Sequence, residues 1–516
     1  MTASKPPSGD RRRNLTIGGS LRCDDALAAA HETHHLKLAR GAAGRVAASA
    51  KRIKKAVADG EWVYGVTTGF GSNAVNPIRD EDASELQHNL LVSHAFGDGE
   101  PLDDEVVRLA LLLRIHALAQ GNSGIRPQTL HALMRLYEAD VLAVVPERGS
   151  VGASGDLAPL SHLALPLIGE GKARLGGRTM SSKAALKKAG LEPVTLSYKE
   201  GLALVNGMQV TLAIGLLALE RAETLLRTAD VAAALTTEAL AGRSPAFDAR
   251  IHEVRRHPGQ AVSAARIRKL LKGSKLVDAD IDKIPGKRIA PQDAYGIRCA
   301  PQVHGASVDG MGFVREVFDR EVDAITDNPL VFDDGILSGG NFHGQPIALA
   351  ADHLKLCTHE LGSISERRTA TLIDPHMNEG LPAYLAPKAG LHSGFMIPQY
   401  VAAALTSESK GLCFPASADS VPTGANIEDH VSMGPIAARR ARQVGDLVTS
   451  ILAIELLTAA QAVDLRELRP SRASARVIEA VRTVVPFRAK DRPWKDSLPR
   501  VKALIADGTI LRAAGV

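Results

Sequence analysis

The feature that most constrains the fold is an apolar run with helical periodicity at positions 198–241. Aliphatic side chains recur there at three- and four-residue spacing, and glycine interrupts the run only at Gly201, Gly207 and Gly215. Strand-like segments are few and short, such as residues 62–66. The pattern therefore predicts one very long helix in a mainly helical protein.

Other segments carry the same spacing and predict further helices. They are residues 104–119, 127–143, 305–324, 346–372 and 435–463. Proline suits the first turn of a helix, and a proline stands at the start of the second of these segments. We therefore expect a bundle of long helices to make up most of the chain.

A change in composition divides the chain. Residues 171–197 are polar and include Gly176, Gly177 and Pro193, which is typical of a connection between domains. The first residues are also polar and lack the apolar segment of a signal peptide. We expect a disordered tail at 1–13, an N-terminal mixed domain at 14–197, and a long-helix bundle domain with polar C-terminal helices at 198–516.

Composition argues against several classes of partner. Hydrophobic residues make up 45% of the 516 positions and charged residues 23%, as in soluble globular proteins. The net charge is +5 with both signs interspersed, which does not indicate a nucleic-acid or membrane surface. The four cysteines form no CxxC pair, so we expect no disulfide framework or zinc ribbon and place the protein in the cytoplasm.

Two apolar runs, 202–219 and 447–465, approach the length of a membrane span. The first contains Asn206 and Gln209, and the second contains Glu455. Because polar groups are expensive in hydrocarbon, we expect both runs to be buried helices of a soluble bundle.

A loop of small residues at 149–162 offers unusual chemistry. It reads Gly-Ser-Val-Gly-Ala-Ser-Gly-Asp-Leu-Ala-Pro-Leu-Ser-His. The amide nitrogen of Gly155 could reach the carbonyl carbon of Ala153 and close a five-membered ring, because glycine permits tight turns. Loss of water, including the Ser154 hydroxyl, would leave an exocyclic methylidene on an imidazolone. That group is a strong electrophile, and no ordinary side chain provides one.

Competing motifs fit this chain less well. A nucleophile elbow needs glycine two residues after the serine, where Asp156 stands, and a phosphate-binding loop needs a lysine that the segment lacks. His31 and His35 match the HExxH pattern of zinc enzymes, but no third ligand follows, so we interpret them as surface residues and predict no metal site. Residues 69–74 approximate a dinucleotide fingerprint, but Pro77 interrupts the helix that should follow.

The segment 149–162 closely resembles the signature of the aromatic amino-acid ammonia-lyases, which build a methylidene-imidazolone (MIO) from Ala-Ser-Gly. Further strings match the same family in the same order and spacing: 63–71, 93–97, 199–207, 291–298, 339–344 and 426–433. The resemblance extends over residues 15–465 and, within the family, is to the histidine ammonia-lyases.

The resemblance implies a mainly α, aspartase/fumarase-like architecture, a long-helix bundle with a smaller N-terminal mixed domain. It implies a homotetramer whose active sites are shared between subunits, with a small-molecule amino acid as substrate. The MIO would form from Ala153, Ser154 and Gly155 without an external cofactor. Nucleic-acid and membrane partners are not expected.

The resemblance also implies roles for individual side chains. Tyr64 and Tyr295 match the catalytic tyrosines of the family, and either could serve as a base. Arg298 would bind the substrate carboxylate through a bidentate pair. Asn206 would form a hydrogen bond to the amine or the ring of the substrate. Phe342 would pack on the imidazolone, and Gln292 would line the site.

His94 and Glu428 bear on the choice of substrate. A carboxylate suits an imidazole better than a phenyl ring, and phenylalanine and tyrosine lyases carry an amide at the position of Glu428. Glu428 therefore favours L-histidine, which would be converted to trans-urocanate and ammonia in histidine catabolism. Tyrosine lyases share a histidine like His94, so His94 alone does not discriminate.

Three residues depart from the histidine-lyase pattern: Ile427 stands where glutamine is usual, Met208 where threonine is common and Gly296 where serine is common. Because of Ile427, two alternative activities stay open. One is a tyrosine or phenylalanine ammonia-lyase, and the other is an MIO aminomutase that adds ammonia back at the β-carbon. A helical scaffold without catalysis is the alternative from another class.

Overall fold

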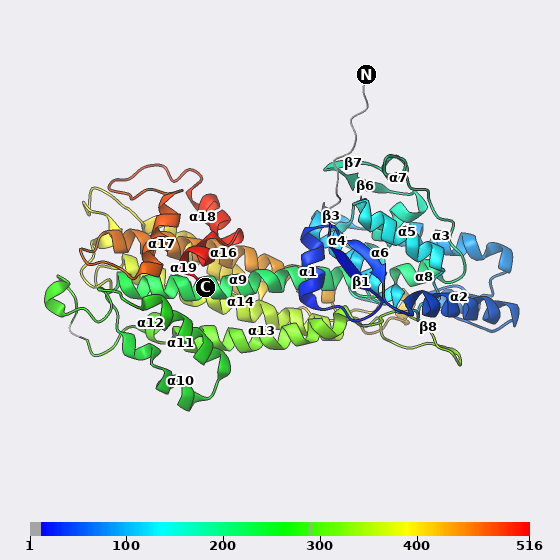
Figure 1. The fold of residues 1–516 in the computed structure, drawn as a ribbon, viewed down its shortest axis with the longest axis horizontal. Helices are drawn as coiled ribbons and strands as arrows, with labels where there is room; N and C mark the ends of the chain where they lie inside the picture. Colours follow the sequence, from blue (N-terminus) through cyan, green and yellow to red (C-terminus); the bar gives the residue numbers. More distant parts are fainter. Residues whose placement is uncertain (1–11, 289) are drawn as a thin grey trace, which may run out of the picture. The chain divides into compact units, whose positions relative to one another are not determined.

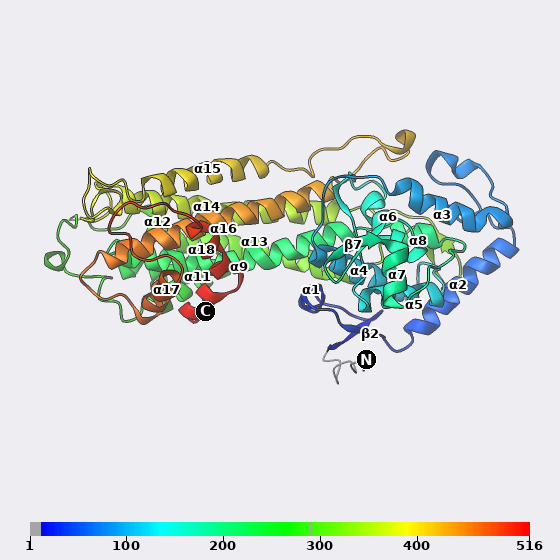
Figure 2. The same ribbon diagram turned by 90° about the horizontal axis from the view of Figure 1, so that it is seen from above.

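The computed structural model describes residues 12–288 and 290–516, and its secondary structure is mainly helical (Figures 1 and 2). This confirms the predicted fold class. Residues 1–11 of the expected tail lie outside the described residues. At the end of that segment, Arg12 Nη1 donates to the Glu138 carbonyl at 2.6 Å, and the Arg13 carbonyl accepts from the His35 amide at 2.9 Å.

The chain forms two compact units, and each is discontinuous in sequence. The first unit is Met1–Leu217, Glu316–Leu349 and Ala416–Arg439, and the second is Ala218–Arg315, Ala350–Pro415 and Arg440–Val516. The boundary expected after residue 197 follows composition, whereas the units follow contacts between residues. Residues 198–217 therefore belong to the first unit.

Four long helices contribute residues to both units. They are α9 (Gln209–Ala239), α13 (Ala300–Val322), α14 (Gln345–Ile373) and α16 (Gly434–Asp464). The last three begin and end within a few residues of the predicted segments, α13 with the largest difference. Their parts in the second unit run alongside one another in both views (Figures 1 and 2).

The first unit combines shorter helices with small sheets. Its helices are α1 (Cys23–His31), α2 (Ala42–Ala58), α3 (Ala83–His94), α4 (Asp104–Ala119), α5 (Pro127–Glu138), α6 (Leu157–Ala164), α7 (Ser182–Ala189) and α8 (Glu200–Val205). Its strands are β1 (Asn14–Ile17), β2 (His35–Leu38), β3 (Asp98–Pro101), β4 (Leu142–Ala143), β5 (Pro146–Arg148), β6 (Lys172–Leu175), β7 (Arg178–Ser181), β8 (Leu330–Val331) and β9 (Ile336–Leu337).

The sheets of the first unit are small. β1 pairs in parallel with β2, and β3 pairs antiparallel with β5. β4, β6 and β7 form an antiparallel sheet of three strands, and β8 pairs antiparallel with β9. Sheets of this size are marginal alone, so helix packing must supply most of the stability of the unit.

Helix α4 forms the core of the first unit and has the predicted bounds. Asp104 and Glu105 stand in its first turn, where the helix dipole favours negative charge. Every residue of 109–119 is buried. The predicted helix 127–143 is shorter in the structure, because α5 ends at Glu138 and Asp140 takes a left-handed φ of 53° before β4 begins.

The single helix predicted for 198–241 is wrong in one respect, because it breaks between α8 and α9. Gly207 has φ 147°, a conformation that side-chain residues rarely adopt, and its carbonyl accepts from the Asp156 amide at 2.7 Å. The buried Arg114 guanidinium donates to the carbonyl of Asn206 at 2.6 Å, and also to that of Ala203. These contacts replace the intrahelical hydrogen bonds that a continuous helix would make.

Residues 62–66, expected to be strand-like, form no strand, and a turn covers residues 64–67. Gly65 has φ 65°, and Thr67 Oγ1 accepts from the Val63 amide at 2.9 Å. Val63 and Val66 pack into a buried cluster with Ile53 of α2. The apolar pattern therefore reflects an anchored turn, not a strand.

The second unit is helical apart from its loops. Besides parts of the four long helices it contains α10 (Ala249–Arg255), α11 (Pro258–Leu271), α12 (Tyr295–Arg298), α15 (Met396–Leu412), α17 (Arg472–Arg482), α18 (Ser497–Ala506) and α19 (Thr509–Ala514). Polar side chains also pair in its core: Arg368 binds Glu455 at 2.5 and 2.8 Å, and His304 Nδ1 lies 2.7 Å from Asp230.

Helix α16 is, within the described ranges, the one helix long and apolar enough to span a membrane by composition. Its most apolar window has a mean hydropathy of 1.5 and is 83% buried inside the protein. Helix α16 contains all but the last residue of the predicted apolar run 447–465. The other apolar run, 202–219, is divided by the break between α8 and α9. Burial of this extent is that of a core helix, as the sequence predicts.

Candidate active site

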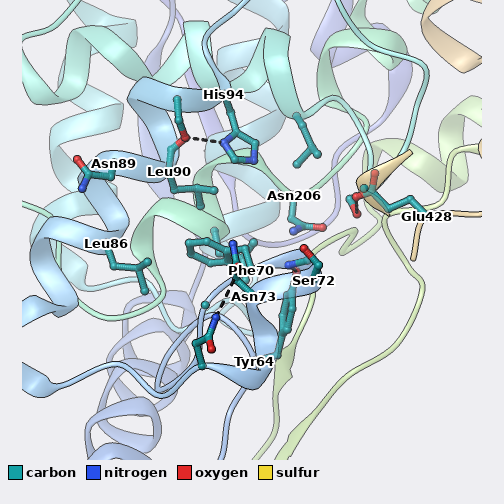
Figure 3. A pocket seen from close by; sticks show the side chains of 18 of the residues that line it. Tyr64, Phe70, Ser72, Asn73, Leu86, Asn89, Leu90, His94, Asn206 and Glu428 are labelled. Carbon is teal, nitrogen blue, oxygen red and sulfur yellow. Dashed lines mark hydrogen bonds between the residues drawn. The ribbon is translucent and has the colours of Figure 1, made fainter. Parts of the chain in front are cut away.

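One pocket of the first unit gathers residues from distant parts of the sequence. Its volume is about 740 Å³, within the range of small-molecule sites (Figure 3). The predicted site residues that line it are Tyr64, His94, Ser154, Asn206 and Glu428. They come from the turn at 64–67, the end of α3, the loop before α6, the break after α8 and a turn before α16.

The Ala153–Ser154–Gly155 loop has an unusual backbone. Ser154 has φ 48° and Gly155 has φ 85°, so a serine occupies the left-handed region that favours glycine. A Cβ atom at Gly155 would collide with the carbonyl oxygen of Gly207. Only glycine therefore fits at position 155, and the strained serine beside it is the kind of outlier that clusters at functional sites.

Asp156 ties this loop to the start of α9. Its carboxylate is fully buried and accepts from the Thr211 amide at 2.7 Å and from Thr211 Oγ1 at 2.6 Å. Burial raises the pKa of Asp156 to about 6, although the hydrogen bonds from Thr211 act in the opposite direction. The loop and the break between α8 and α9 are thus held as one piece.

Glu428 faces the loop from a tight turn. Ser154 Oγ donates to Glu428 Oε1 at 3.0 Å, and Thr423 Oγ1 donates to Glu428 Oε2 at 2.7 Å. Ala425 and Asn426, with φ 56° and 69°, form the turn between Thr423 and Glu428. Both carboxylate oxygens therefore have a partner, and the side chain points into the pocket beside Asn206 (Figure 3).

Asn206 presents an unsatisfied polar atom to the pocket. Its residue is 3% exposed, and its Oδ1 has no hydrogen-bond partner among the described residues. Its position is fixed from behind, since Arg114 holds its carbonyl oxygen. A buried acceptor without a partner costs free energy, so Asn206 is prepared to accept a hydrogen bond from a ligand.

Tyr64 and His94 complete the predicted residues of this pocket. The Tyr64 hydroxyl oxygen accepts from the Gly71 amide at 3.0 Å, and its ring meets Phe70 edge-on at 6.3 Å. His94 Nδ1 lies 3.0 Å from Ser93 Oγ. Burial lowers the pKa of His94, against a smaller raising effect from Glu428. His94 is therefore a mainly neutral imidazole at pH 7.

Comparisons with known proteins match nearly the whole length of the chain to one family. The profile of the family described as aromatic amino acid lyase matches residues 21–483. A histidine ammonia-lyase of Myxococcus xanthus is 48% identical over 508 residues, covering 98% of both chains. The chain belongs to the aromatic amino acid lyase family.

Two solved structures extend this family assignment to the fold. The histidine ammonia-lyase from Trypanosoma cruzi is 42% identical, with a TM-score of 0.89 over 98% of this chain and 95% of that chain. The tyrosine aminomutase from Streptomyces globisporus is 36% identical, with a TM-score of 0.92 over 98% of each chain. The fold is therefore the mainly α, fumarase-like fold of the aromatic amino acid lyases, and the predicted lyase class is confirmed.

Ala153 and Gly155 flank Ser154 without lining the pocket, and four further residues expected in an aromatic amino acid lyase site lie outside its lining. Phe342 belongs to the first unit and is half-buried. Gln292, Tyr295 and Arg298 belong to the second unit. Tyr295 and Arg298 share a helical turn, with the guanidinium 4.5 Å from the ring centre. Arg298 Nε is buried and has no hydrogen-bond partner among the described residues.

The residues that depart from the histidine-lyase pattern lie in different environments. Ile427 is 60% exposed and does not line the pocket, unlike its neighbour Glu428. Met208 is buried, and a Cβ atom at Gly344 would collide with its methyl group. A threonine in place of Met208 would leave part of that space unfilled. At Gly296 a Cβ atom would lie 3.2 Å from Arg368 Cγ.

The HExxH pattern does not have the geometry of a zinc helix. His31 ends α1 and His35 begins β2, so the two are not one helical turn apart. His31 Nδ1 lies 3.2 Å from Glu105 instead. Residues 71–75 form a short 3-10 helix that lines the pocket, in place of a dinucleotide-binding turn.

Sequence reasoning missed residues that act through others. Arg114 and Thr423 hold Asn206 and Glu428, and no local motif marks either of them. Phe70 lines the pocket against Tyr64. It stands within the quoted string 63–71, so the low aromatic content of 3% could have drawn attention to it. Asp156 directly follows the Ala-Ser-Gly loop, so its place within the segment 149–162 could also have drawn attention to it.

Proposed function

We propose that this protein is a histidine ammonia-lyase that converts L-histidine to trans-urocanate and ammonia. The observation that carries the proposal is the Glu428 carboxylate, which accepts a hydrogen bond from Ser154 Oγ and, together with His94, lines a pocket of about 740 Å³. An imidazole N–H can donate a strong hydrogen bond to a carboxylate, whereas a phenyl ring has no hydrogen-bond donor. The relative from Myxococcus xanthus, at 48% identity, bears the name of this activity.

The loop fits the MIO prosthetic group proposed for it. Ring closure needs a glycine after the serine, and the cradle formed by Gly207 admits no side chain at position 155. The left-handed Ser154 and the buried Asp156 hold the loop away from an ordinary extended course. The group would supply an electrophile toward the substrate amine, with no external cofactor.

Residues of the first unit would bind the amine and the imidazole. The unpartnered Asn206 Oδ1 accepts a hydrogen bond from the substrate ammonium. Glu428 accepts the imidazole N–H, and His94 lines the same pocket. The Tyr64 oxygen accepts from the Gly71 amide, which fixes the position of this hydroxyl in the pocket where proton transfer would take place.

Residues of the second unit would bind the carboxylate. Arg298 offers a planar pair of donors, and its buried Nε lacks a partner. Tyr295 stands one helical turn away under the guanidinium. In the proposed homotetramer, each active site is shared between subunits. One subunit would supply the pocket described above, and another would supply Tyr295, Arg298, Gln292 and Phe342.

A second candidate function uses the same prosthetic group with a different substrate or a different product. The similarity to a tyrosine aminomutase at 36% identity, and Ile427 beside Glu428, favour testing a tyrosine or phenylalanine lyase or an aminomutase. Product analysis with L-histidine, L-tyrosine and L-phenylalanine separates these activities. Urocanate from histidine, followed by its absorbance, supports the proposal, and no urocanate contradicts it.

A non-catalytic scaffold predicts no covalent change. The proposed MIO lowers the intact mass by two water molecules, whereas a scaffold keeps the full mass. Ser154→Ala should abolish both the mass deficit and turnover. We also propose a cytoplasmic location, which the four free cysteines of the structure suit.

A further inference from the structure

We propose that Glu428 has a role in the chain before any substrate binds: its carboxylate orients the Ser154 hydroxyl for the water loss that completes the prosthetic group. The inference rests on the proposed MIO and deepens it. It concerns the maturation of the loop, and is separate from the role of Glu428 toward imidazole.

The contact that carries the inference belongs to the unprocessed chain. Before any water is lost, residue 154 is an ordinary serine, and its Oγ donates to Glu428 Oε1 at 3.0 Å. No other hydrogen bond to this hydroxyl occurs in the part of the chain that the structure describes. The mature group lacks the Ser154 oxygen, so the contact can act only while the oxygen is still in place.

Glu428 is itself held so that it can orient a partner. Thr423 Oγ1 donates to its second oxygen at 2.7 Å, and the Thr423 amide donates to the Glu428 carbonyl at 2.9 Å. The turn between them contains two left-handed residues, Ala425 and Asn426. One carboxylate oxygen is thus fixed by Thr423, and the other remains for Ser154.

The chemistry requires two separate losses of water. When the Gly155 nitrogen bonds to the Ala153 carbonyl carbon, the carbonyl oxygen leaves with the hydrogens of the Gly155 and Ser154 nitrogens. The second water consists of the Ser154 hydroxyl and the Ser154 Cα hydrogen. The electron pair of the Cα–H bond becomes the Cα=Cβ double bond while the Cβ–Oγ bond breaks.

Orientation matters in the second loss. The Cβ–Oγ bond must stand perpendicular to the new ring so that the electron pair from Cα can expel the oxygen. A free serine side chain samples three staggered positions about χ1. The hydrogen bond to Glu428 selects one of them. It holds the hydroxyl by its hydrogen, so the oxygen lone pairs remain able to take up the proton that completes the departing water.

The experiment follows the tryptic peptide 149–172, which cleavage after Arg148 and Lys172 releases. The full-length protein is made by cell-free translation, and the peptide mass is recorded over time. The variants are Glu428→Ala, Glu428→Gln and, as a matched control, Asp429→Asn, whose carboxylate is exposed. Circular dichroism melting shows that each variant is folded.

The expected result distinguishes the two losses. Glu428→Ala accumulates a peptide that has lost one water and completes the second loss about tenfold more slowly, as expected when a hydrogen bond to a charged group is removed. Glu428→Gln keeps an acceptor oxygen and matures near the wild-type rate, as does Asp429→Asn. Thr423→Val, which leaves Glu428 in place without its anchor, gives an intermediate rate.

Other results overturn the inference. Completion of both losses at the wild-type rate in folded Glu428→Ala does so, and so does failure of that variant to lose even the first water. Equal accumulation in Glu428→Ala and Glu428→Gln excludes the acceptor role. A wild-type peptide of full mass contradicts the proposed prosthetic group itself. Failure of histidine turnover with normal peptide masses contradicts only the proposed substrate.

Discussion

The backbone amide of Asp156 donates a hydrogen bond of 2.7 Å to the carbonyl oxygen of Gly207. This contact joins the loop that contains Ser154 to the break between α8 and α9 that carries Asn206. The two residues proposed to meet the substrate amine are therefore positioned by the same pair of backbone segments. The arrangement depends on Gly207, whose φ of 147° is open to glycine alone.

Gly207→Ala should destabilise the protein and separate these segments. A Cβ atom there would collide with the Gln209 side chain and lie 2.7 Å from Arg114 Nη1, and the backbone conformation itself is strained. We expect a loss of about 1–3 kcal/mol in the free energy of unfolding, measured by urea titration. Gly312→Ala in α13 is the control, because nothing lies within 4 Å of its added Cβ, and it should be stabilised by about 0.5–1 kcal/mol. Equal stability of the two variants would contradict this account.

The break at Gly207 also shows where sequence reasoning stops. The bounds of α4 follow from local pattern, because its apolar residues and its acidic first turn are all within the segment. The break follows from Arg114 and Asp156, which are distant in sequence and replace intrahelical hydrogen bonds by tertiary ones. No periodicity within 198–241 contains that information.

The candidate site divides in the same way. Resemblance drew attention to Tyr64, His94, Ser154, Asn206 and Glu428, and the structure places all five around one pocket. Their catalytic roles remain proposals. The residues that hold them, such as Thr423 against Glu428, follow from folding contacts and carry no motif of their own.

The stability contributed by Asp156 should fall as pH rises. Burial raises its pKa to about 6 from 3.8, so the folded protein binds this proton more tightly than the unfolded chain does. The contribution is complete below about pH 4 and is lost as pH rises through about 6, by roughly 3 kcal/mol. Urea unfolding of wild type and Asp156→Asn between about pH 4 and about pH 8 isolates the effect, because asparagine does not titrate. A difference between the two proteins that stays constant over this range would refute it.

Asn206→Ala should reduce activity without reducing stability. The side-chain oxygen has no partner to lose among the described residues, and Arg114 binds the backbone carbonyl, which alanine retains. Loss of a hydrogen bond to a charged amine should lower kcat/KM for histidine by about tenfold to a hundredfold. Urocanate absorbance measures the activity and thermal melting the stability. Asn89→Ala, at an exposed residue of the same pocket, should retain most activity. A large drop in melting temperature for Asn206→Ala would assign the residue a structural role.

Glu428→Gln should impair histidine turnover selectively. The amide keeps the size of the side chain but removes the charge that accepts the imidazole N–H, so kcat/KM should fall about tenfold or more. Relative activity on L-tyrosine or L-phenylalanine should rise in comparison, and product analysis on all three amino acids measures both effects. Asp429→Asn next to it should leave the preference unchanged. An unchanged preference in Glu428→Gln would remove the basis for assigning histidine.

Arg114→Lys should be poorly tolerated although it conserves charge. Arg114 is 2% exposed and donates to the Asn206 carbonyl at 2.6 Å, to Gln209 Oε1 at 3.0 Å and to the Ala203 carbonyl. Burial lowers its pKa to about 10, which leaves the guanidinium charged at pH 7. A lysine ammonium cannot reproduce the planar set of donors, and a buried lysine is more readily deprotonated.

For Arg114→Lys we expect a loss of about 2 kcal/mol or more in unfolding free energy, since at least one buried carbonyl loses its donor. We also expect a fall in kcat, because the Asn206 side chain depends on that carbonyl for its position. Arg135→Lys, at an exposed arginine of α5, should change neither, and an equally small effect at Arg114 would show that the break between α8 and α9 does not need the guanidinium.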